Sequence, residues 1–450
     1  MKHTTLDDRK QLFRLTWPIF LEAVLFSVIG SVDTLMIAGY AENTIGAVGV
    51  SNQILSLFSV ISNIITSGTG ILCAQYIGAG RSTKEKQPLV LGALMVNTCL
   101  GVIFSLMAGC GAEFLLDMMK TPPEQYEYAR QYLSIVGSFL FLQMITMSFT
   151  VVIRAHGKTR ASMTFSIIMN LANVALNYVL INGHLGLPEL GVAGAAIATV
   201  ISKVLACILA GSYLFCGVLR GMSLKPNWRE MGRSIRKVLA FGAPAAGEQI
   251  SYTLSKIVVM AMVTSLGAVA LDAYTVVNTV VSYVYLFSMA IGQGTSIMVG
   301  WEAGRGSTEH AKGICRFAAN VSMVIAMGVL AVLCLLHKPV IGIFSGNPAV
   351  LVMCGGVFLA DFVLEAGRSR NLVVVNALRA AGDVRFPLYI GLFSMWFFSV
   401  GVSWLLGIGF GWGLVGIWLG LGLDECFRAV GMQIRWEKGT WTKFVLKKND

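Results

Sequence analysis

Acidic side chains inside long apolar stretches are the residues of this sequence that could do chemistry. Five of them are Glu22, Asp33, Glu248, Asp361 and Glu365. A carboxylate among apolar side chains is costly unless it holds a proton, pairs with a basic group or coordinates a small hard cation. The chemistry they indicate is therefore reversible binding of a proton or a cation such as Na⁺ in an apolar interior.

Three of these acids lie in the second half of the chain. At a helical rise of about 1.5 Å per residue, Glu248 and Asp361 reach a similar depth in their segments. Asp361 and Glu365 are four residues apart and so share one helical face. We expect Glu248, Asp361 and Glu365 to form one cation-coupling cluster. Lys256 is an accessory candidate that either neutralises Asp361 or Glu365 or takes part in the coupling.

The first half carries a different polar set. Asn170, Asn173 and Asn177 follow the spacing i, i+3, i+7 and lie on one helical face. Asp33 and Asn177 both fall in the outer part of their segments, where amide oxygens could assist a carboxylate that holds a proton or Na⁺. Asp33, Asn173 and Asn177 are cation-coupling candidates. Asn170 is an accessory candidate, and the alternative for these asparagines is a hydrogen bond to a neighbouring helix. Glu22 is also accessory, and beside Pro18 it could instead brace a helix kink.

The elements that must position these residues are membrane-spanning helices. Of 450 residues, 56% are hydrophobic and 13% are charged, and the mean hydropathy is +0.72. Soluble proteins carry about 25% charged residues. Apolar runs of roughly 20 residues match the ~30 Å hydrocarbon layer, and only helices satisfy their backbone there. We expect an all-α membrane protein with spans at 14–39, 50–77, 88–112, 128–153, 161–183, 191–219, 238–265, 270–301, 316–336, 347–367, 386–408 and 412–434.

The chain also repeats itself at a spacing of 226 residues. Pro18 and Glu22 match Pro244 and Glu248, and the segment from Gly68 to Gly80 matches the segment from Gly294 to Gly306. At a spacing of 225, Arg154, Ala155 and Gly157 match Arg379, Ala380 and Gly382. Two like hydrophobic halves are typical of transporters. We expect two pseudo-symmetric six-helix lobes, at 1–220 and 237–450, joined by a cytoplasmic linker at 221–236.

The net charge of +11 follows the predicted membrane topology. One set of loops holds only Lys120, Arg130 and Lys338. The other set holds most of the basic residues: Arg81, Lys84, Lys86, Arg154, Lys158, Arg160, Arg220, Lys225, Arg229, Arg233, Arg236, Lys237, Arg305, Lys312, Arg316, Arg368, Arg370, Arg379 and Arg385. The positive-inside rule places this set and both basic termini in the cytoplasm. The charge therefore predicts a multi-pass plasma-membrane protein, with lipid rather than nucleic acid as its partner.

Several long motifs, in order, resemble the multidrug and toxic compound extrusion (MATE) family. They are WPIFLE, GSVDTLMIAGY, GTGILCAQYIGAG, NVALNYVLINGHLGLPELGVAGAAIAT, GAPAAGEQISY and LEAGRSRNLVVVNALRAAGD. The resemblance implies twelve helices in two lobes and multidrug efflux by antiport, in which organic cations and drugs leave in exchange for Na⁺ or H⁺. It implies that Asp33 couples the cation, with Asn173 and Asn177 as a paired motif. Asn177 is the form of the NorM-like branch. Glu248 is similar to the family's span 7 glutamate, and Asp361 and Glu365 to its span 10 acidic site.

Two other functions are weighed against antiport. A lipid-linked oligosaccharide flippase would need a cavity rich in basic residues for pyrophosphate, and the spans offer Lys203 and Lys256 as interior cations. An intramembrane enzyme would need a catalytic set, and all five histidines fall at the terminus or in loops. The nine cysteines show no metal-ligand spacing. We therefore expect a monomeric transporter without enzymatic activity, cofactor or structural metal, with Na⁺ at the acidic sites only as a coupling ion.

Overall fold

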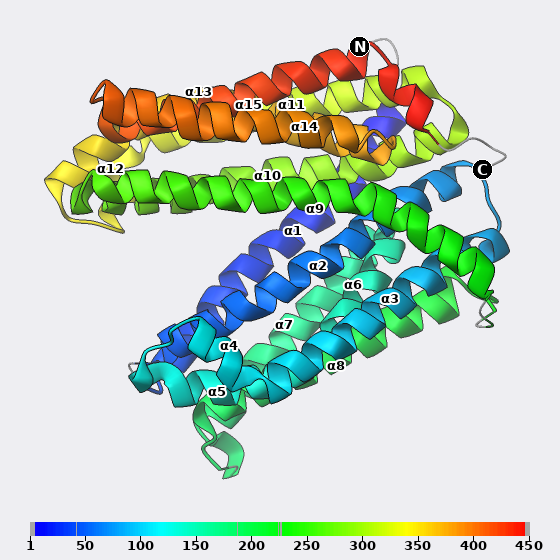
Figure 1. Ribbon diagram of the computed structural model, residues 1–450, viewed down its shortest axis with the longest axis horizontal. Helices are drawn as coiled ribbons and strands as arrows, with labels where there is room; N and C mark the ends of the chain where they lie inside the picture. Colours follow the sequence, from blue (N-terminus) through cyan, green and yellow to red (C-terminus); the bar gives the residue numbers. More distant parts are fainter. Residues whose placement is uncertain (1–4, 42, 187, 224, 226, 446–450) are drawn as a thin grey trace. The chain divides into compact units, whose positions relative to one another are not determined.

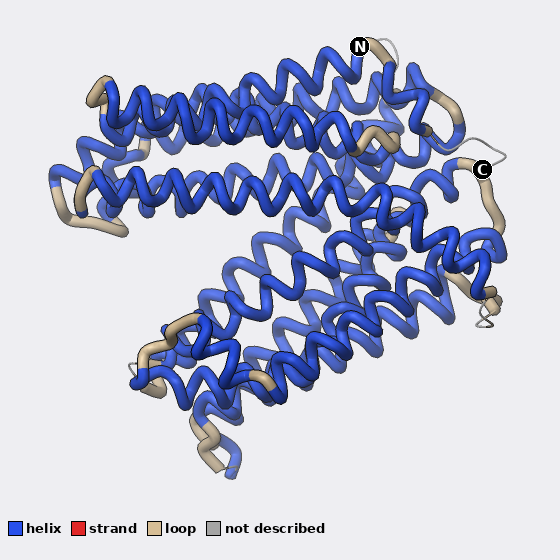
Figure 2. The backbone as a smooth tube through the Cα atoms, in the orientation of Figure 1, coloured by secondary structure: helices blue, strands red, loops and turns tan. Residues whose placement is uncertain are grey.

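The computed structural model describes residues 5–41, 43–186, 188–223, 225 and 227–445, and every regular element in these ranges is a helix (Figures 1 and 2). The first half contains α1 (Leu6–Ala38), α2 (Thr44–Gly78), α3 (Thr83–Cys110), α4 (Ala112–Met118), α5 (Pro123–Ser138), α6 (Leu140–Ala155), α7 (Thr159–Ile181), η1 (His184–Gly186), α8 (Gly191–Tyr213) and η2 (Leu214–Val218). The second contains α9 (Trp228–Ser265), α10 (Ala268–Arg305), α11 (Thr308–Leu335), α12 (His337–Gly342), α13 (Pro348–Ala380), α14 (Arg385–Ser394), η3 (Met395–Val402), η4 (Leu405–Gly409), α15 (Gly413–Glu437) and η5 (Thr440–Phe444).

These helices make up twelve membrane crossings, six in each half, as predicted. Within the described ranges, nine are long and apolar enough to span a bilayer alone: α1, α2, α3, α7, α8 with η2, α10, α11, α13, and α14 with η3 and η4. The pair α5 and α6, bent by 48°, gives a tenth. The last two, α9 and α15, are long enough but more polar, because charged residues lie inside them.

Tight turns separate the helices at glycines that the repeat places in equivalent positions. Gly80 follows α2 with φ 69°, and Gly306 follows α10 with φ 80°. A residue with a Cβ is disfavoured at such angles, whereas glycine is not. After the first turn, Ser82 begins α3: its hydroxyl accepts from the Glu85 N–H, and the Glu85 carboxylate accepts from the Ser82 N–H.

The span predicted at 347–367 is longer in the structure, where α13 continues to Ala380. Arg368, Arg370 and Arg379 therefore lie in a helix, and their prediction as loop residues was wrong. The arginines lower the local hydropathy, which shortens the predicted span. They are nevertheless compatible with a continuing helix, because each guanidinium has a side-chain partner in the same half of the chain.

Packing divides the chain into two compact units at places that differ from the sequence halves. Unit 1 comprises the residues up to Phe20, the segment Ala74–Gly80, and Ala243 onward; unit 2 comprises Leu21–Cys73 and Arg81–Gly242. In unit 1, the Gln75 amide donates to the Ala380 carbonyl over 2.7 Å. In unit 2, the first part of α9 lies so close to α2 that a Cβ on Gly242 would overlap the Ile64 carbonyl. Close backbone approach at small residues is typical of membrane helices.

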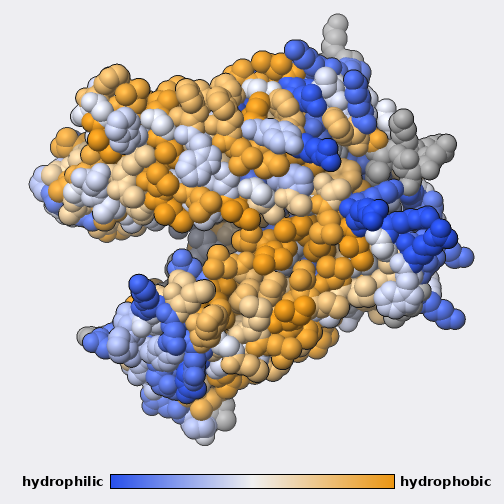
Figure 3. Space-filling view, viewed as in Figure 1, coloured by the Kyte–Doolittle hydropathy of each residue, from blue (hydrophilic) through white to orange (hydrophobic). Residues whose placement is uncertain are grey.

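Each unit has an apolar interior. In unit 1, one core contains Trp436 and Trp441, stacked with ring centroids 4.5 Å apart, and another contains Trp418 against Tyr274. In unit 2, the core includes Leu133 and Met144, both fully buried. On the face shown in Figure 3, apolar side chains cover much of the surface along the helices, and hydrophilic ones gather near helix ends. The same apolar chemistry thus serves helix packing and contact with lipid.

His156 lies at a helix end outside the membrane, and its burial makes the stability of the fold depend on pH. It follows α6, and burial lowers its pKa from 6.5 to about 4. In the neutral form its Nδ1–H donates to the Val152 carbonyl (2.8 Å), and Nε2 accepts from the Lys86 ammonium (3.4 Å). Between pH 6.5 and about 4 the unfolded chain therefore binds more protons than the folded one, so stability falls as the pH drops through this window.

Replacing this histidine should reduce the acid sensitivity of the protein. We expect the melting temperature of His156→Asn to fall less than that of the wild type between about pH 7.5 and about pH 5, because asparagine does not titrate there. Thermal unfolding in detergent at both pH values measures this. An equal fall in the two proteins would show that His156 is not held neutral by the fold.

Candidate functional site

Glu22 lies on α1 inside unit 2, where three side chains surround its carboxylate. Oε2 is 2.8 Å from the Arg154 guanidinium at the end of α6. Ser166 on α7 donates its hydroxyl to Oε1 over 2.6 Å, and Ser162 donates to Oε2 over 3.4 Å. Both oxygens are therefore engaged, and α1, α6 and α7 meet at this one residue. This arrangement favours the bracing role over a direct part in coupling.

The asparagines of α7 face the interior, as their spacing predicts. Asn170, Asn173 and Asn177 are 8%, 8% and 2% exposed. The Asn177 amide donates to Oδ1 of Asn173 (3.3 Å), and the Asn173 amide donates to the Thr199 hydroxyl on α8 (3.4 Å). Asn173 thus makes a hydrogen bond to a neighbouring helix, and its predicted part in cation coupling stays a prediction. The backbone of Asp33 lies in α1, but its side chain is outside the described residues, so its predicted role stays a prediction.

Glu248 lies on α9 inside unit 1 and is 7% exposed. Its Oε2 accepts from the Arg379 guanidinium on α13 over 2.5 Å. Arg379 is one of the arginines that the sequence assigns to a loop, so the extension of α13 is what provides the partner. Removing one partner of such a buried ion pair strongly destabilises the folded protein, because the other charge is then buried without a counter-charge.

Asp361 and Glu365 are both fully buried on α13, and each has its own partner. Oδ1 of Asp361 accepts from the indole N–H of Trp418 on α15 over 2.8 Å, while Oδ2 has no hydrogen bond. Glu365 forms an ion pair with Arg368 one turn along the same helix. Among the described residues no hydrogen bond joins Glu248, Asp361 and Glu365 to one another. Arg368 nevertheless links two of them, because it pairs with Glu365 and also adds positive charge near Asp361.

Lys256 points its ammonium toward the Tyr252 ring, 5.5 Å from the ring centroid. No salt bridge pairs it with a carboxylate in the described part of the chain. It acts on Asp361 through space, as Arg368 does. Asp361 thus has two positive charges in its surroundings but no direct ionic partner.

A buried charge cluster that was not predicted from the sequence lies on α15. Asp424, Glu425 and Arg428 are 2%, 8% and 4% exposed. The Arg428 guanidinium contacts Asp424 (2.9 Å) and Glu425 (2.7 Å). Asn371 donates to Glu425 over 2.8 Å, and Ser394 and Ser399 donate to Asp424. The signal was present, because these charges fall inside the span predicted at 412–434.

The sequence offered Lys203 and Lys256 as the interior cations of the spans, and the structure adds Arg368, Arg379 and Arg428. Each of these arginines is paired with a carboxylate.

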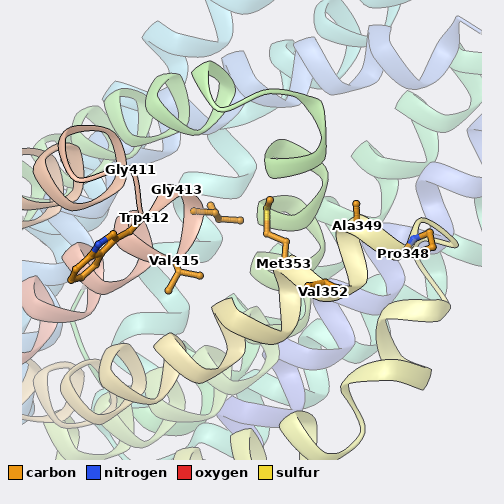
Figure 4. A pocket seen from close by; sticks show the side chains of 9 residues that line it. Pro348, Ala349, Val352, Met353, Gly411, Trp412, Gly413 and Val415 are labelled. Carbon is orange, nitrogen blue, oxygen red and sulfur yellow. The ribbon is translucent and has the colours of Figure 1, made fainter.

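A shallow cavity of about 600 Å³ opens at the start of α13 and the loop before α15 (Figure 4). Its lining is Pro348, Ala349, Val352, Met353, Gly411, Trp412, Gly413, Leu414 and Val415. None of these side chains carries a charge, so the cavity offers no group that binds an ion. In the described ranges, no three His, Cys, Asp or Glu side chains are grouped as metal ligands.

The two halves of the chain match one known protein family. The family model described as MatE matches residues 18–179 and 244–405. The two matches have equal length and follow the internal repeat, so each half contains one copy of the family unit. This chain belongs to the MATE family of transporters. It is therefore a multi-pass membrane transporter rather than an enzyme, in agreement with the resemblance seen in the sequence.

Relatives of this MATE transporter match over almost their whole length. The "Uncharacterized transporter YisQ" of Bacillus subtilis is 35% identical over 435 residues, which cover 97% of this chain and 95% of the relative. The "Multidrug resistance protein PmpM" of Pseudomonas aeruginosa is 25% identical over 452 residues, covering 95% and 91%. Each alignment thus covers at least 91% of the relative as well as at least 95% of this chain.

Solved structures support the MATE fold. A structure described as "Crystal structure of MATE in the bent conformation" aligns with a TM-score of 0.87 at 18% identity, covering 97% of this chain and 96% of the other. A second, "Outward-facing conformation of a multidrug resistance MATE family transporter of the MOP superfamily", gives 0.86 at 18% identity and covers 97% of each chain. The twelve-helix, two-lobe architecture is thus the fold of the family.

Proposed function

We propose that this MATE transporter exports organic cations, drugs among them, in exchange for an inward-moving proton or Na⁺. The family supports transport, and relatives such as PmpM of Pseudomonas aeruginosa are named as multidrug resistance proteins. A secondary transporter needs buried groups that bind the coupling ion near the middle of the membrane. Both units contain buried polar groups of this kind, which is why antiport is the function we infer.

The observation that carries this proposal is the environment of Asp361. It is fully buried, and its Oδ2 has no hydrogen-bond partner. A buried carboxylate oxygen without a partner is costly, so the group gains stability when it takes up a proton or a cation. Trp418 offers an N–H donor, which cannot coordinate Na⁺. Arg368 and Lys256 add positive charge that opposes uptake of either ion, whereas burial disfavours the charged carboxylate and so favours its protonated form. We therefore favour the proton as the ion bound at Asp361.

The first lobe contributes the second half of the proposal. Asp33, Asn173 and Asn177 are proposed to bind a coupling ion there, on the basis of their types and spacing and of the resemblance to the family. Coupling requires that drug and ion favour different conformations or compete for the same groups, because a ligand shifts an equilibrium only by its differential affinity. Alternating access between the two lobes provides such a pair of states.

The arrangement in the membrane is part of the same proposal. The basic loops support a plasma-membrane location with both termini in the cytoplasm, and we propose that one chain is the transporting unit. In a variant without its nine native cysteines, single cysteines placed at Lys225 and Glu189 should react with a membrane-impermeant reagent from opposite sides of the membrane. Reaction of both from one side would contradict this topology, and a dimer mass in light scattering would contradict the monomer.

The proposal is tested by efflux of a fluorescent organic cation from proteoliposomes, with a pH gradient and a Na⁺ gradient imposed separately. We expect one gradient to drive efflux, and we expect Asp33→Asn to abolish it if the first lobe carries the coupling ion. Efflux that survives Asp33→Asn would assign coupling to Asp361 and its neighbours. If neither gradient drove efflux of any cation, the antiport proposal would be refuted.

A further inference from the structure

One ion pair occurs twice in this chain, once in each half. Glu22 pairs with Arg154 over 2.8 Å in unit 2, and Glu248 pairs with Arg379 over 2.5 Å in unit 1. Glu22 and Glu248 are equivalent by the repeat spacing of 226, and Arg154 and Arg379 by the spacing of 225. Both partners have therefore been retained in both halves, and each pair ties the first helix of its half to the fourth crossing.

In the first half, two serines of α7 complete this pair. Ser166 donates to Oε1 of Glu22 over 2.6 Å. Ser162 accepts from Nε of Arg154 over 3.0 Å and donates to Oε2 of Glu22 over 3.4 Å. Neither carboxylate oxygen is left open, so release of Glu22 from Arg154 would break several hydrogen bonds at once.

In the second half, both serines are missing. The spacing of 225 that relates Arg154 to Arg379 also relates Arg160 to Arg385, so it places Pro387 at the position of Ser162 and Gly391 at that of Ser166. Without these two hydroxyls, Nε of Arg379 is buried without a hydrogen-bond partner. Oε1 of Glu248 likewise receives no hydrogen bond from a described residue. Among the described residues, the Arg379 guanidinium is therefore the one direct ionic contact of Glu248, and Arg428 on α15 adds positive charge through space.

Geometry identifies Gly391 as the position that keeps Oε1 open. A Cβ built on Gly391 would lie 3.2 Å from Cγ, 3.3 Å from Cδ and 3.4 Å from Oε1 of Glu248. These are tight contacts, but they fall on a flexible side chain, so a small shift could accommodate a larger residue. A serine at this position would bring its hydroxyl within reach of Oε1, as Ser166 does for Glu22.

We propose that the duplicated Glu–Arg pair has diverged into a fixed brace in the first half and an exchangeable site in the second, and that Gly391 determines the difference. Glu22 remains paired, whereas Glu248 can leave Arg379 and accept a proton or a small cation. The part that Glu248 would play in the transport cycle rests on the proposed antiport. Its structural content, the unequal availability of two equivalent carboxylates, does not depend on what is transported.

The test is residue-resolved labelling with dicyclohexylcarbodiimide, a hydrophobic reagent that modifies carboxyl groups in their protonated form. The purified full-length protein is treated in detergent, and the label on Glu22 and Glu248 is quantified by mass spectrometry. We expect Glu248 to react at least about tenfold faster than Glu22, since a hydrogen bond to a charged group shifts an equilibrium by this order. Equal rates at the two residues would overturn the proposal.

Exchanging the key residues between the halves sharpens the test. Gly391→Ser should slow labelling of Glu248 toward the rate of Glu22, whereas Gly391→Ala adds the Cβ without a donor and should keep it fast. In the first half, Ser166→Gly should raise labelling of Glu22, with Ser166→Thr as the matched control that retains the hydroxyl. Slowing by alanine as much as by serine would show that bulk alone matters and would contradict the assigned role of Gly391.

Transport is read separately, so that the two proposals fail independently. With antiport established for the wild type, Gly391→Ser should reduce gradient-driven efflux and Gly391→Ala should do so less. Wild-type vesicles without any driven efflux would refute the antiport while leaving the labelling ratio valid. If Gly391→Ser does not fold, as judged by thermal unfolding, the Ser166→Gly arm decides the matter, and unchanged labelling of Glu22 there would overturn the inference.

Discussion

Arg428→Met should strongly destabilise the folded protein. Arg428 is 4% exposed, and its guanidinium is the only cation paired with Asp424 and Glu425 in the described part of the chain. Its removal leaves two adjacent carboxylates in the interior of unit 1 without a directly paired cation. Breaking a buried ion pair from one side costs about 3–5 kcal/mol, a large share of the ~5–15 kcal/mol that holds a typical fold together.

Thermal unfolding in detergent measures this loss. A thiol-reactive dye reports it in a background where the exposed Cys99, Cys110 and Cys216 are replaced by serine, because Cys73, Cys315 and Cys354 are fully buried and become reactive on unfolding. The matched control is Arg428→Met combined with Asp424→Asn and Glu425→Gln, which removes all three charges and should recover much of the stability. Wild-type stability of the single variant would contradict the assignment of Arg428 as the group that neutralises this cluster.

Asp361→Asn should remove gradient-driven transport while the protein stays folded. Asparagine has the same shape and can still accept from the Trp418 indole, so the contact between α13 and α15 is kept. It cannot take up a proton, so the coupling carried by this residue is lost. Coupling free energies of the usual size change an equilibrium affinity by about 5- to 150-fold, so we expect the concentration ratio of the cation that the gradient sustains to fall by at least about fivefold.

Two measurements distinguish lost coupling from lost binding. Fluorescence anisotropy of the organic cation should give a similar affinity for Asp361→Asn and the wild type, while driven efflux falls. Trp418→Phe is the matched control, because it removes the hydrogen bond and retains the carboxylate, so driven efflux should persist. Undiminished efflux by Asp361→Asn would show that the unpartnered oxygen of Asp361 does not bind the coupling ion.

The sequence predicts the architecture well because the signals that set it are local. The length and apolarity of each stretch identify the crossings, and the repeat of Glu22 at Glu248 identifies two equivalent lobes. The turn glycines Gly80 and Gly306 end α2 and α10 at equivalent positions, as a backbone with positive φ requires. The inward face of α7 follows from the spacing of Asn170, Asn173 and Asn177 alone.

The partners of the site residues could not be predicted in the same way. Arg379 lies 131 positions from Glu248 in the chain, and only the tertiary fold brings the two side chains together. Hydropathy also works against such residues, because an arginine that neutralises a buried acid lowers the score of its own helix. That effect ended the predicted span before Arg368 and Arg379. The cluster at Asp424 lay inside a predicted span, but its significance depends on contacts from other helices, such as that of Asn371 with Glu425.

The most direct test of the proposed antiport is uptake of the coupling ion driven by an outward gradient of the drug. Proteoliposomes loaded with an organic cation, and diluted into medium without it, are monitored with an internal pH dye and with radioactive Na⁺. Because coupling is reciprocal, outward movement of the drug should pull protons inward, and Asp361→Asn vesicles should show no such uptake. Drug efflux without uptake of either ion in the wild type would contradict a cation-coupled antiporter.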